Sequence, residues 1–180
     1  MKDADLASDL QTGAPGVAER LVALYGDRLV RSAFLLCGDE SEAQDLAQDT
    51  FLQAIKSAPR FRGHSAVYTW VYGILLNLWR NHRRRQGRLI YTDNLPDLPS
   101  DSTPPHDDMD ARMRAEAVRR ALLRLSDEHR EVVLLRYFEH LRINEVARCI
   151  GVPAGTVKSR IFNATQRLRE ELPGELNLFR

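Results

Sequence analysis

The sequence predicts an all-α protein built from two small helical domains joined by a flexible acidic linker. Apolar residues recur with a helical period of 3.6 through most of the chain, and the alternation typical of strands is scarce. A stretch rich in proline and aspartate interrupts the periodicity. We therefore expect a first domain over residues 10–90, a linker over 91–110 and a second domain over 111–175. The 180 residues, 43% of them hydrophobic, suffice for two cores.

The net charge of +1 excludes the bulk basic character of many nucleic-acid-binding proteins, so such a role would depend on local charge. Charge is indeed segregated: arginines gather between Arg80 and Arg88, whereas residues 93–110 hold six aspartates and no Lys or Arg. We expect the acidic, proline-rich stretch to be a flexible linker, because it cannot bury enough apolar area to offset its chain entropy.

The two cysteines, Cys37 and Cys149, lie far apart inside apolar helical patterns. We expect free, buried thiols rather than a disulfide or a CxxC site. The acidic N-terminus lacks a signal-peptide core, and no apolar run approaches eighteen residues. The sequence therefore predicts a cytoplasmic protein with no membrane span.

The first domain is predicted to contain three helices. The first begins near Val17 and ends at Gly38, and the second runs from Ser41, in a capping-box pattern with Gln44, to Pro59. The first helix is expected to direct one set of apolar side chains inward: Leu21, Leu24, Tyr25 and Leu29.

The third helix opens at about Ser65 and continues through the arginines. Its expected buried stripe consists of Val71, Ile74, Leu75 and Leu78.

The second domain resumes the helical period near Ala111, and Ser126 is placed to cap a further helix. A short helix from Ile143 is then broken by Gly151, and a new helix begins at about Pro153. This is the outline of a helix-turn-helix, which many helical hairpins also share.

The last helix has an apolar side and a polar side on which Phe162 stands among Lys158, Ser159 and Asn163. Hydroxyl and amide groups can hydrogen-bond to base edges, lysine can meet guanine or phosphate, and an aromatic ring can touch a thymine methyl group. The alternative is that Phe162 packs against a neighbouring helix and the polar side chains are only solvated.

Residues 125–172, with the core GTVKSR, resemble region 4 of bacterial sigma-70 family factors, and most closely the extracytoplasmic-function (group IV) class. The resemblance implies that this domain reads the promoter −35 element. The residues implied for DNA binding are Thr156, Lys158, Ser159, Arg160, Phe162 and Asn163. Arg142 stands where the family often has a capping serine, so we expect the helix that follows it to start raggedly.

An acidic stripe with an apolar residue in it marks the helix over residues 41–59, and it suggests either a protein partner or a solvated face. Residues 42–63 resemble sigma regions 2.1 and 2.2, whose corresponding face docks on the clamp helices of the RNA polymerase β′ subunit. The resemblance implies that the docking residues are Asp45, Gln48, Asp49 and Leu52.

Aromatic and cationic residues alternate along the next helix, a combination that suits single-stranded DNA because rings stack on bases and arginines hold the backbone. The segment HSAVYTWVYGILLNLWRNHRRR resembles sigma regions 2.3 and 2.4, which implies a pocket for a flipped base of the −10 element. The implied residues are Phe61, His64, Tyr68, Trp70, Asn77, Arg80, Asn81 and Arg84.

Core packing is the alternative for Tyr68 and Trp70. Gly73 takes a place where the family often has arginine, and the missing side chain permits close approach of a partner.

The resemblance identifies the chain as a group IV sigma factor, a class that catalyses no covalent reaction and needs no cofactor or metal. It implies core RNA polymerase (the β′ clamp helices and the β flap), promoter DNA in duplex and single-stranded form, and an anti-sigma factor as partners. Two alternatives are a stand-alone helix-turn-helix regulator and a DNA recombinase or nuclease. The second would need a catalytic cluster, and the carboxylates Glu42, Asp45 and Asp49 lie on one helix with no histidine near them in the sequence.

Overall fold

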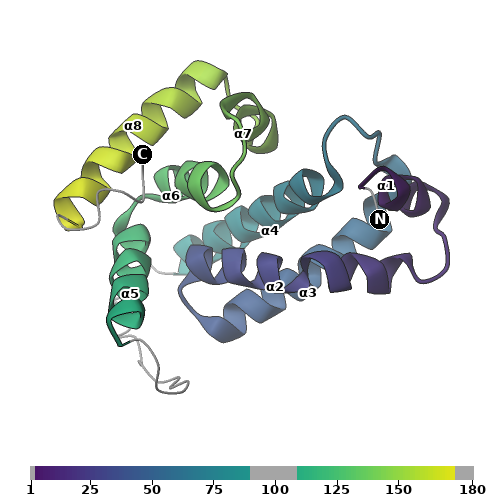
Figure 1. The fold of residues 1–180 in the computed structure, drawn as a ribbon, viewed down its shortest axis with the longest axis horizontal. Helices are drawn as coiled ribbons and strands as arrows, with labels where there is room; N and C mark the ends of the chain where they lie inside the picture. Colours follow the sequence, from purple (N-terminus) through teal and green to yellow (C-terminus); the bar gives the residue numbers. More distant parts are fainter. Residues whose placement is uncertain (1–2, 90–108, 173–180) are drawn as a thin grey trace.

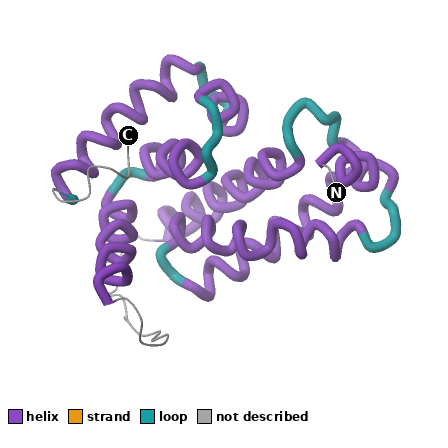
Figure 2. The backbone as a smooth tube through the Cα atoms, viewed as in Figure 1, coloured by secondary structure: helices purple, strands orange, loops and turns teal. Residues whose placement is uncertain are grey.

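A computed structural model of the protein describes residues 3–89 and 109–172, and in these ranges the chain consists of helices joined by short loops, with no strand (Figures 1 and 2). The predicted all-α fold of two helical domains is confirmed. The N-terminal domain consists of α1 (Asp3–Thr12), α2 (Val17–Cys37), α3 (Glu40–Ser57), a 3₁₀ turn (Ala58–Arg60) and α4 (Val67–Leu89). The C-terminal domain consists of α5 (Met109–Arg124), α6 (Asp127–Val133), a π-helical segment (Leu134–Phe138), α7 (Ile143–Ile150) and α8 (Ala154–Glu171).

The tight turn between α2 and α3 is set by Gly38 and Asp39. Gly38 adopts a left-handed conformation, with φ of 83°, and its N–H donates to the carbonyl of Phe34 at 2.8 Å. Asp39 is extended, and its carboxylate accepts a hydrogen bond from the Glu42 N–H at 2.8 Å. The predicted cap at Ser41 is therefore wrong: the helix begins at Glu40, because the glycine reverses the chain early enough for Asp39 to cap it.

Helix α1 was not among the predicted elements. It is anchored by Leu6 and Leu10, each 1% exposed, at the end of the N-terminal domain. Gln11 at its end donates from Nε2 to the carbonyl of Phe61 at 2.6 Å. Helix α1 therefore supports the loop that leads into α4.

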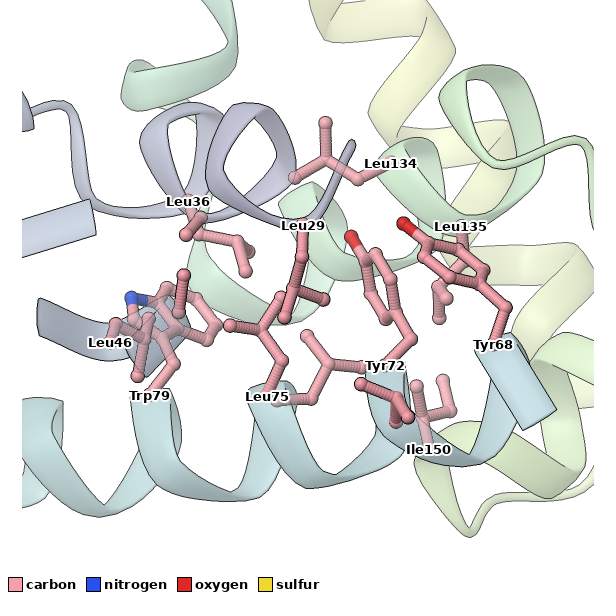
Figure 3. Close-up of a cluster of buried hydrophobic side chains, with 14 of the residues drawn as sticks. Leu29, Leu36, Leu46, Tyr68, Tyr72, Leu75, Trp79, Leu134, Leu135 and Ile150 are labelled. Carbon is pink, nitrogen blue, oxygen red and sulfur yellow. The ribbon is translucent and has the colours of Figure 1, made fainter. Parts of the chain in front are cut away.

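The core of the N-terminal domain forms where α4 lies against α2 and α3. Its buried α4 side chains include Tyr72, Leu75 and Trp79 (Figure 3), together with Val71 and Leu76. Ile74 and Leu78 of the predicted stripe are only partly buried. Leu24 of α2, predicted to be buried, is 51% exposed, because the buried face of α2 is centred between Leu21 and Leu29 and Leu24 lies beyond its edge.

The C-terminal domain contains the predicted helix-turn-helix, made of α7 and α8. Gly151, with φ of 74°, ends α7, and its N–H donates to the carbonyl of Ala147 at 2.9 Å. The ragged start expected for α7 at Arg142 is wrong. Instead the carboxylate of Glu145 accepts from the backbone N–H of Arg142 at 2.7 Å and fixes the start of the helix.

The two domains pack directly against one another, α7 against α4 and α5 and α6 against α2 (Figure 1). Leu134, Leu135 and Ile150 of the C-terminal domain extend the apolar cluster that Leu29 and Tyr72 build in the N-terminal domain (Figure 3). Helix α8 lies along the outer side of its domain, away from the N-terminal helices (Figure 1). Residues 91–108 of the predicted linker lie outside the described residues, and α5 begins at Met109.

Candidate nucleic-acid interface

Helix α8 presents a polar face with one aromatic side chain in it. Phe162 is 62% exposed, and Lys158, Ser159 and Asn163 around it are exposed as well. The opposite face is anchored in the domain by Val157, Ala164, Thr165 and Leu168. The alternative that Phe162 packs against a neighbouring helix is therefore wrong.

Two further α8 residues of the predicted set are partly held within the protein. The guanidinium of Arg160 pairs with the carboxylate of Glu128 on α6 at 2.8 Å, and its side chain is only 19% exposed. Thr156 is half-buried, and its carbonyl accepts from the Ser159 hydroxyl at 3.0 Å. These contacts fix the first turns of α8 and leave Lys158, Phe162 and Asn163 free to face a ligand.

The loop before α4 forms a pocket of about 220 Å³ with aromatic and basic walls. Its lining comprises Arg60, Phe61, Arg62, His64, Ser65 and Trp70. The rings of Phe61 and Trp70 lie 4.8 Å apart, with Phe61 buried and Trp70 half-buried, so the pocket has a fixed aromatic floor. Arg60 and Arg62 were absent from the predicted set, although their position on either side of Phe61 could have signalled them.

Tyr68 belongs to the core and not to this surface. It is 6% exposed, its ring lies 5.1 Å from that of Tyr25, and the guanidinium of Arg28 stacks on it at 4.0 Å. Burial also raises the pKa of its hydroxyl well above the usual value. Core packing, the alternative that the sequence left open, therefore describes Tyr68, and its ring cannot stack on a base in this arrangement.

The remaining α4 candidates differ in their availability. Asn77 is exposed and borders a cavity between α4 and α7, and the exposed Arg84 donates to Asn81 Oδ1 at 2.6 Å. Arg80 is already engaged: its Nε and Nη2 donate to the two carboxylate oxygens of Glu131 on α6, at 2.6 and 2.5 Å. Sequence reasoning did not foresee this partner, because Glu131 lies 51 residues away.

Helix α3 carries the predicted acidic stripe on its outer side. Asp45, Gln48 and Asp49 are exposed, and Leu52 among them is 48% exposed. The inner side of the helix is packed through small and apolar residues: Ala43, Leu46, Ala47, Thr50, Phe51 and Ala54. An apolar side chain framed by carboxylates on a rigid helix is a surface suited to a basic protein partner.

Neither cysteine has the character of a reactive group. Burial raises the pKa of the Cys37 and Cys149 thiols to about 12, so both stay protonated near neutral pH. Within residues 3–89 and 109–172, no group of three or more His, Cys, Asp or Glu side chains is placed to hold a metal ion. The helices that the structure describes include none that is both long and apolar enough to cross a membrane.

An exposed helix in a helix-turn-helix and an aromatic, basic pocket on a separate domain are features typical of DNA-binding proteins. The Sigma-70 region 2 family matches residues 21–89, and the Sigma-70 region 4 family matches residues 121–170. The chain belongs to the sigma-70 family of RNA polymerase sigma factors, in its extracytoplasmic-function class.

Full-length relatives agree with this assignment. The chain is 31% identical over 190 aligned residues to the RNA polymerase sigma-H factor of Pseudomonas aeruginosa, covering 95% of this chain and 94% of that protein. It is 34% identical to the ECF RNA polymerase sigma factor SigE of Mycolicibacterium smegmatis, over 86% of this chain and 61% of that protein. Among solved structures, the sigma factor RpoE in complex with the anti-sigma factor NepR, from Bartonella quintana, matches with a TM-score of 0.69 and 25% identity. That match covers 87% of this chain and 97% of the other.

Proposed function

We propose that this sigma factor docks on core RNA polymerase through α3, captures unpaired −10 bases with the loop before α4, and reads the −35 duplex with α8. The observation that carries the proposal is the separation of three exposed surfaces, each on a rigid helix or beside one. The family role in promoter-directed transcription initiation requires such surfaces, and it requires no covalent chemistry.

Recognition of the −35 element rests on the outer face of α8. A helix fits the major groove, where Lys158 can meet guanine or phosphate, Ser159 and Asn163 can hydrogen-bond to base edges, and Phe162 can touch a thymine methyl group. The Thr156 hydroxyl and the Arg160 guanidinium lie at the border of this face. The Phe162 ring keeps 62% of its surface exposed in the free protein, so it is available to contact DNA.

Capture of the −10 element rests on the pocket of Phe61, His64 and Trp70 and on the nearby Asn77 of α4. Extruding a base costs a few kcal/mol, and stacking on an aromatic side chain returns about 1–3 kcal/mol per base. The exposed Asn81 and Arg84 lie further along α4, where they can contact the strand that leaves the pocket. Asn77→Ala should therefore slow promoter opening.

Opening is measured by permanganate reactivity of unpaired thymines, with polymerase holoenzyme on a promoter selected from a randomised library. Asn144→Ala, at an exposed position of α7, is the matched control. Normal promoter opening with the Asn77 variant would show that Asn77 does not contribute to the −10 pocket.

Docking on polymerase rests on the acidic stripe of α3. Asp49→Ala combined with Gln48→Ala should weaken core polymerase binding and leave the fold intact, because both side chains are exposed. The measurement is a titration of labelled chain with core enzyme. Asp27→Ala, an exposed carboxylate on α2, controls for the lost charge. Unchanged binding of the double variant would remove α3 from the docking surface.

The further partners follow from the family role. The C-terminal domain would contact the β flap of polymerase, and an anti-sigma factor would hold the protein inactive, as NepR is bound in the related Bartonella quintana structure. Such a protein works in the cytoplasm, beside polymerase and chromosomal DNA. The alternatives of a stand-alone regulator and of a DNA-cutting enzyme leave the acidic docking stripe of α3 without a role.

A further inference from the structure

The four cationic side chains of α8 differ in whether a carboxylate holds them. Lys158, Arg167 and Arg169 are exposed, and in the part of the chain that the structure describes none of them has an acidic partner. Arg160 differs from them, because its guanidinium pairs with the carboxylate of Glu128 at 2.8 Å. One cation at the border of the outer face of α8 is therefore neutralised, whereas the other three are free.

The acidic partner stands at the surface of the protein. Glu128 belongs to the first turn of α6, which packs against α8 (Figure 1). Its side chain is 68% exposed, whereas that of Arg160 is 19% exposed. An ion pair with so exposed a carboxylate is weak, because water screens the charges and the long side chains lose freedom when they pair. A phosphate group can therefore compete with Glu128 for the guanidinium.

The neighbouring His129 lies among the same charges. Burial lowers the pKa of its imidazole, Arg167 and Arg160 lower that pKa further, and Glu128 opposes them. His129 is therefore mostly neutral at pH 7 and does not compete with Arg160 as a cation for Glu128. The charges that act on this histidine are two arginines and one carboxylate, so removing the carboxylate changes the local balance strongly.

A carboxylate in this place affects the part of DNA binding that does not depend on sequence. Each phosphate that a cation neutralises strengthens binding and makes it more sensitive to salt. Phosphate contacts position a protein on the duplex but carry no base information. A negative charge that occupies Arg160 at the border of the outer face of α8 therefore lowers the affinity for any duplex and leaves the choice between duplexes to the base contacts.

We propose that Glu128 is a positioning residue that holds Arg160 away from the phosphate backbone while α8 reads the −35 duplex, and so reduces the attraction of the protein for DNA of any sequence. The inference rests on the proposed role of α8. It also assigns Arg160 to the phosphates and not to the base edges. The competing role for Glu128 is purely structural, because an acidic side chain in a first turn stabilises a helix.

The test is the salt dependence of DNA binding by the reconstituted holoenzyme. Two duplexes are titrated between about 50 and about 200 mM salt: a promoter selected from a randomised library, and the same promoter with its −35 element scrambled. Glu128→Gln removes the charge and keeps the shape of the side chain. The released Arg160 should add about one phosphate contact, so the slope of log K against log salt concentration should become more negative by about 0.9.

At a fixed low salt concentration the Glu128→Gln variant should bind both duplexes about 1.5- to 5-fold more tightly, the range expected when an exposed ion pair no longer has to be broken. The ratio of the two affinities should stay the same, because a phosphate contact is equal on either sequence. Combining Glu128→Gln with Arg160→Gln should return the slope to the wild-type value. Glu19→Gln, at an exposed carboxylate of α2, is the matched control for the lost charge.

A wild-type slope in the Glu128→Gln variant, or weaker binding, overturns the proposal, and a lower melting temperature with an unchanged slope is the result expected of a purely structural role. A gain that persists without Arg160 overturns it as well, because another cation would then be responsible. A changed ratio of the two affinities contradicts the assignment of Arg160 to phosphate.

Failure of the underlying function has a separate signature. If the wild-type holoenzyme binds the two duplexes equally, the proposed −35 role of α8 fails. The restraint of Arg160 by Glu128 then fails with it only if the salt slope is also unchanged in the Glu128→Gln variant.

Discussion

Truncating Phe162 separates a DNA-reading role from a structural one. Because the side chain is 62% exposed in the free protein, Phe162→Ala should change the free energy of unfolding by less than about 0.5 kcal/mol. Fully burying a phenylalanine is worth about 1.5–3 kcal/mol, and DNA can cover only the part still exposed. We therefore expect a loss of about 1–2 kcal/mol in promoter binding, or about 5- to 30-fold in affinity.

The assay is a titration of promoter DNA with the reconstituted holoenzyme, using a promoter selected from a randomised library and the same duplex with its −35 element scrambled. Met113 of α5 is 65% exposed, so Met113→Ala removes a similarly exposed apolar side chain on another helix and should leave binding unchanged. We expect the holoenzyme with the Phe162 variant to bind the intact promoter no more tightly than the duplex with the scrambled −35 element. Equal losses for Phe162→Ala and Met113→Ala, or no loss in either, would refute the reasoning.

Two further predictions concern stability and thiol chemistry. Arg130→Met should lower the free energy of unfolding by about 3–5 kcal/mol in urea titrations, because the buried guanidinium donates to four backbone carbonyls that would lose their partner; a loss below about 1 kcal/mol would contradict this. Because the pKa of Cys37 and Cys149 rises from 9.0 to about 12 on burial, the folded chain should be alkylated at pH 8 about a thousandfold more slowly than the urea-unfolded chain. The stability that the two buried, protonated thiols contribute is fully present below pH 9 and is lost as the pH rises from there towards 12. Equal alkylation rates in the folded and unfolded chain, or an unchanged free energy of unfolding across that pH range, would count against burial.

The helices and the recognition surface could be predicted because they depend on local pattern. The period of apolar residues and the breaks at Gly38 and Gly151 place α2, α7 and α8 close to their observed limits. The polar face of α8 also follows from the period, which puts Phe162 opposite the buried Val157 and Leu168.

Features that depend on contacts between distant segments could not be predicted. Tyr68 was a candidate for stacking on DNA, but its ring packs in the core against Tyr25 and Arg28, which lie about forty residues earlier in the sequence. Helix α1 was not predicted because Leu6 and Leu10 are its only large apolar residues, too few to define a helical period. Periodicity identifies a face as apolar or polar and does not identify what covers it.

The same limit explains the interface between the domains. Glu131 and Glu139 look like ordinary surface residues in the sequence, since buried glutamates are rare and their arginine partners lie 51 and 111 residues away. Gly73 gave the one local signal, because a missing side chain in a helix permits close approach. In the structure the neighbour of Gly73 is α7: a Cβ atom at this position would lie 3.8 Å from the sulfur of Cys149, an ordinary contact distance.

The central claim is that this chain gives core RNA polymerase the ability to start transcription at defined promoters. The most direct measurement is transcription in vitro by purified core enzyme on a randomised promoter library, with and without the full chain, followed by mapping of the RNA 5′ ends. We predict discrete start sites that appear only with the chain and that share sequence elements at −35 and −10. Binding of the chain to core enzyme without any chain-dependent start site would contradict the account.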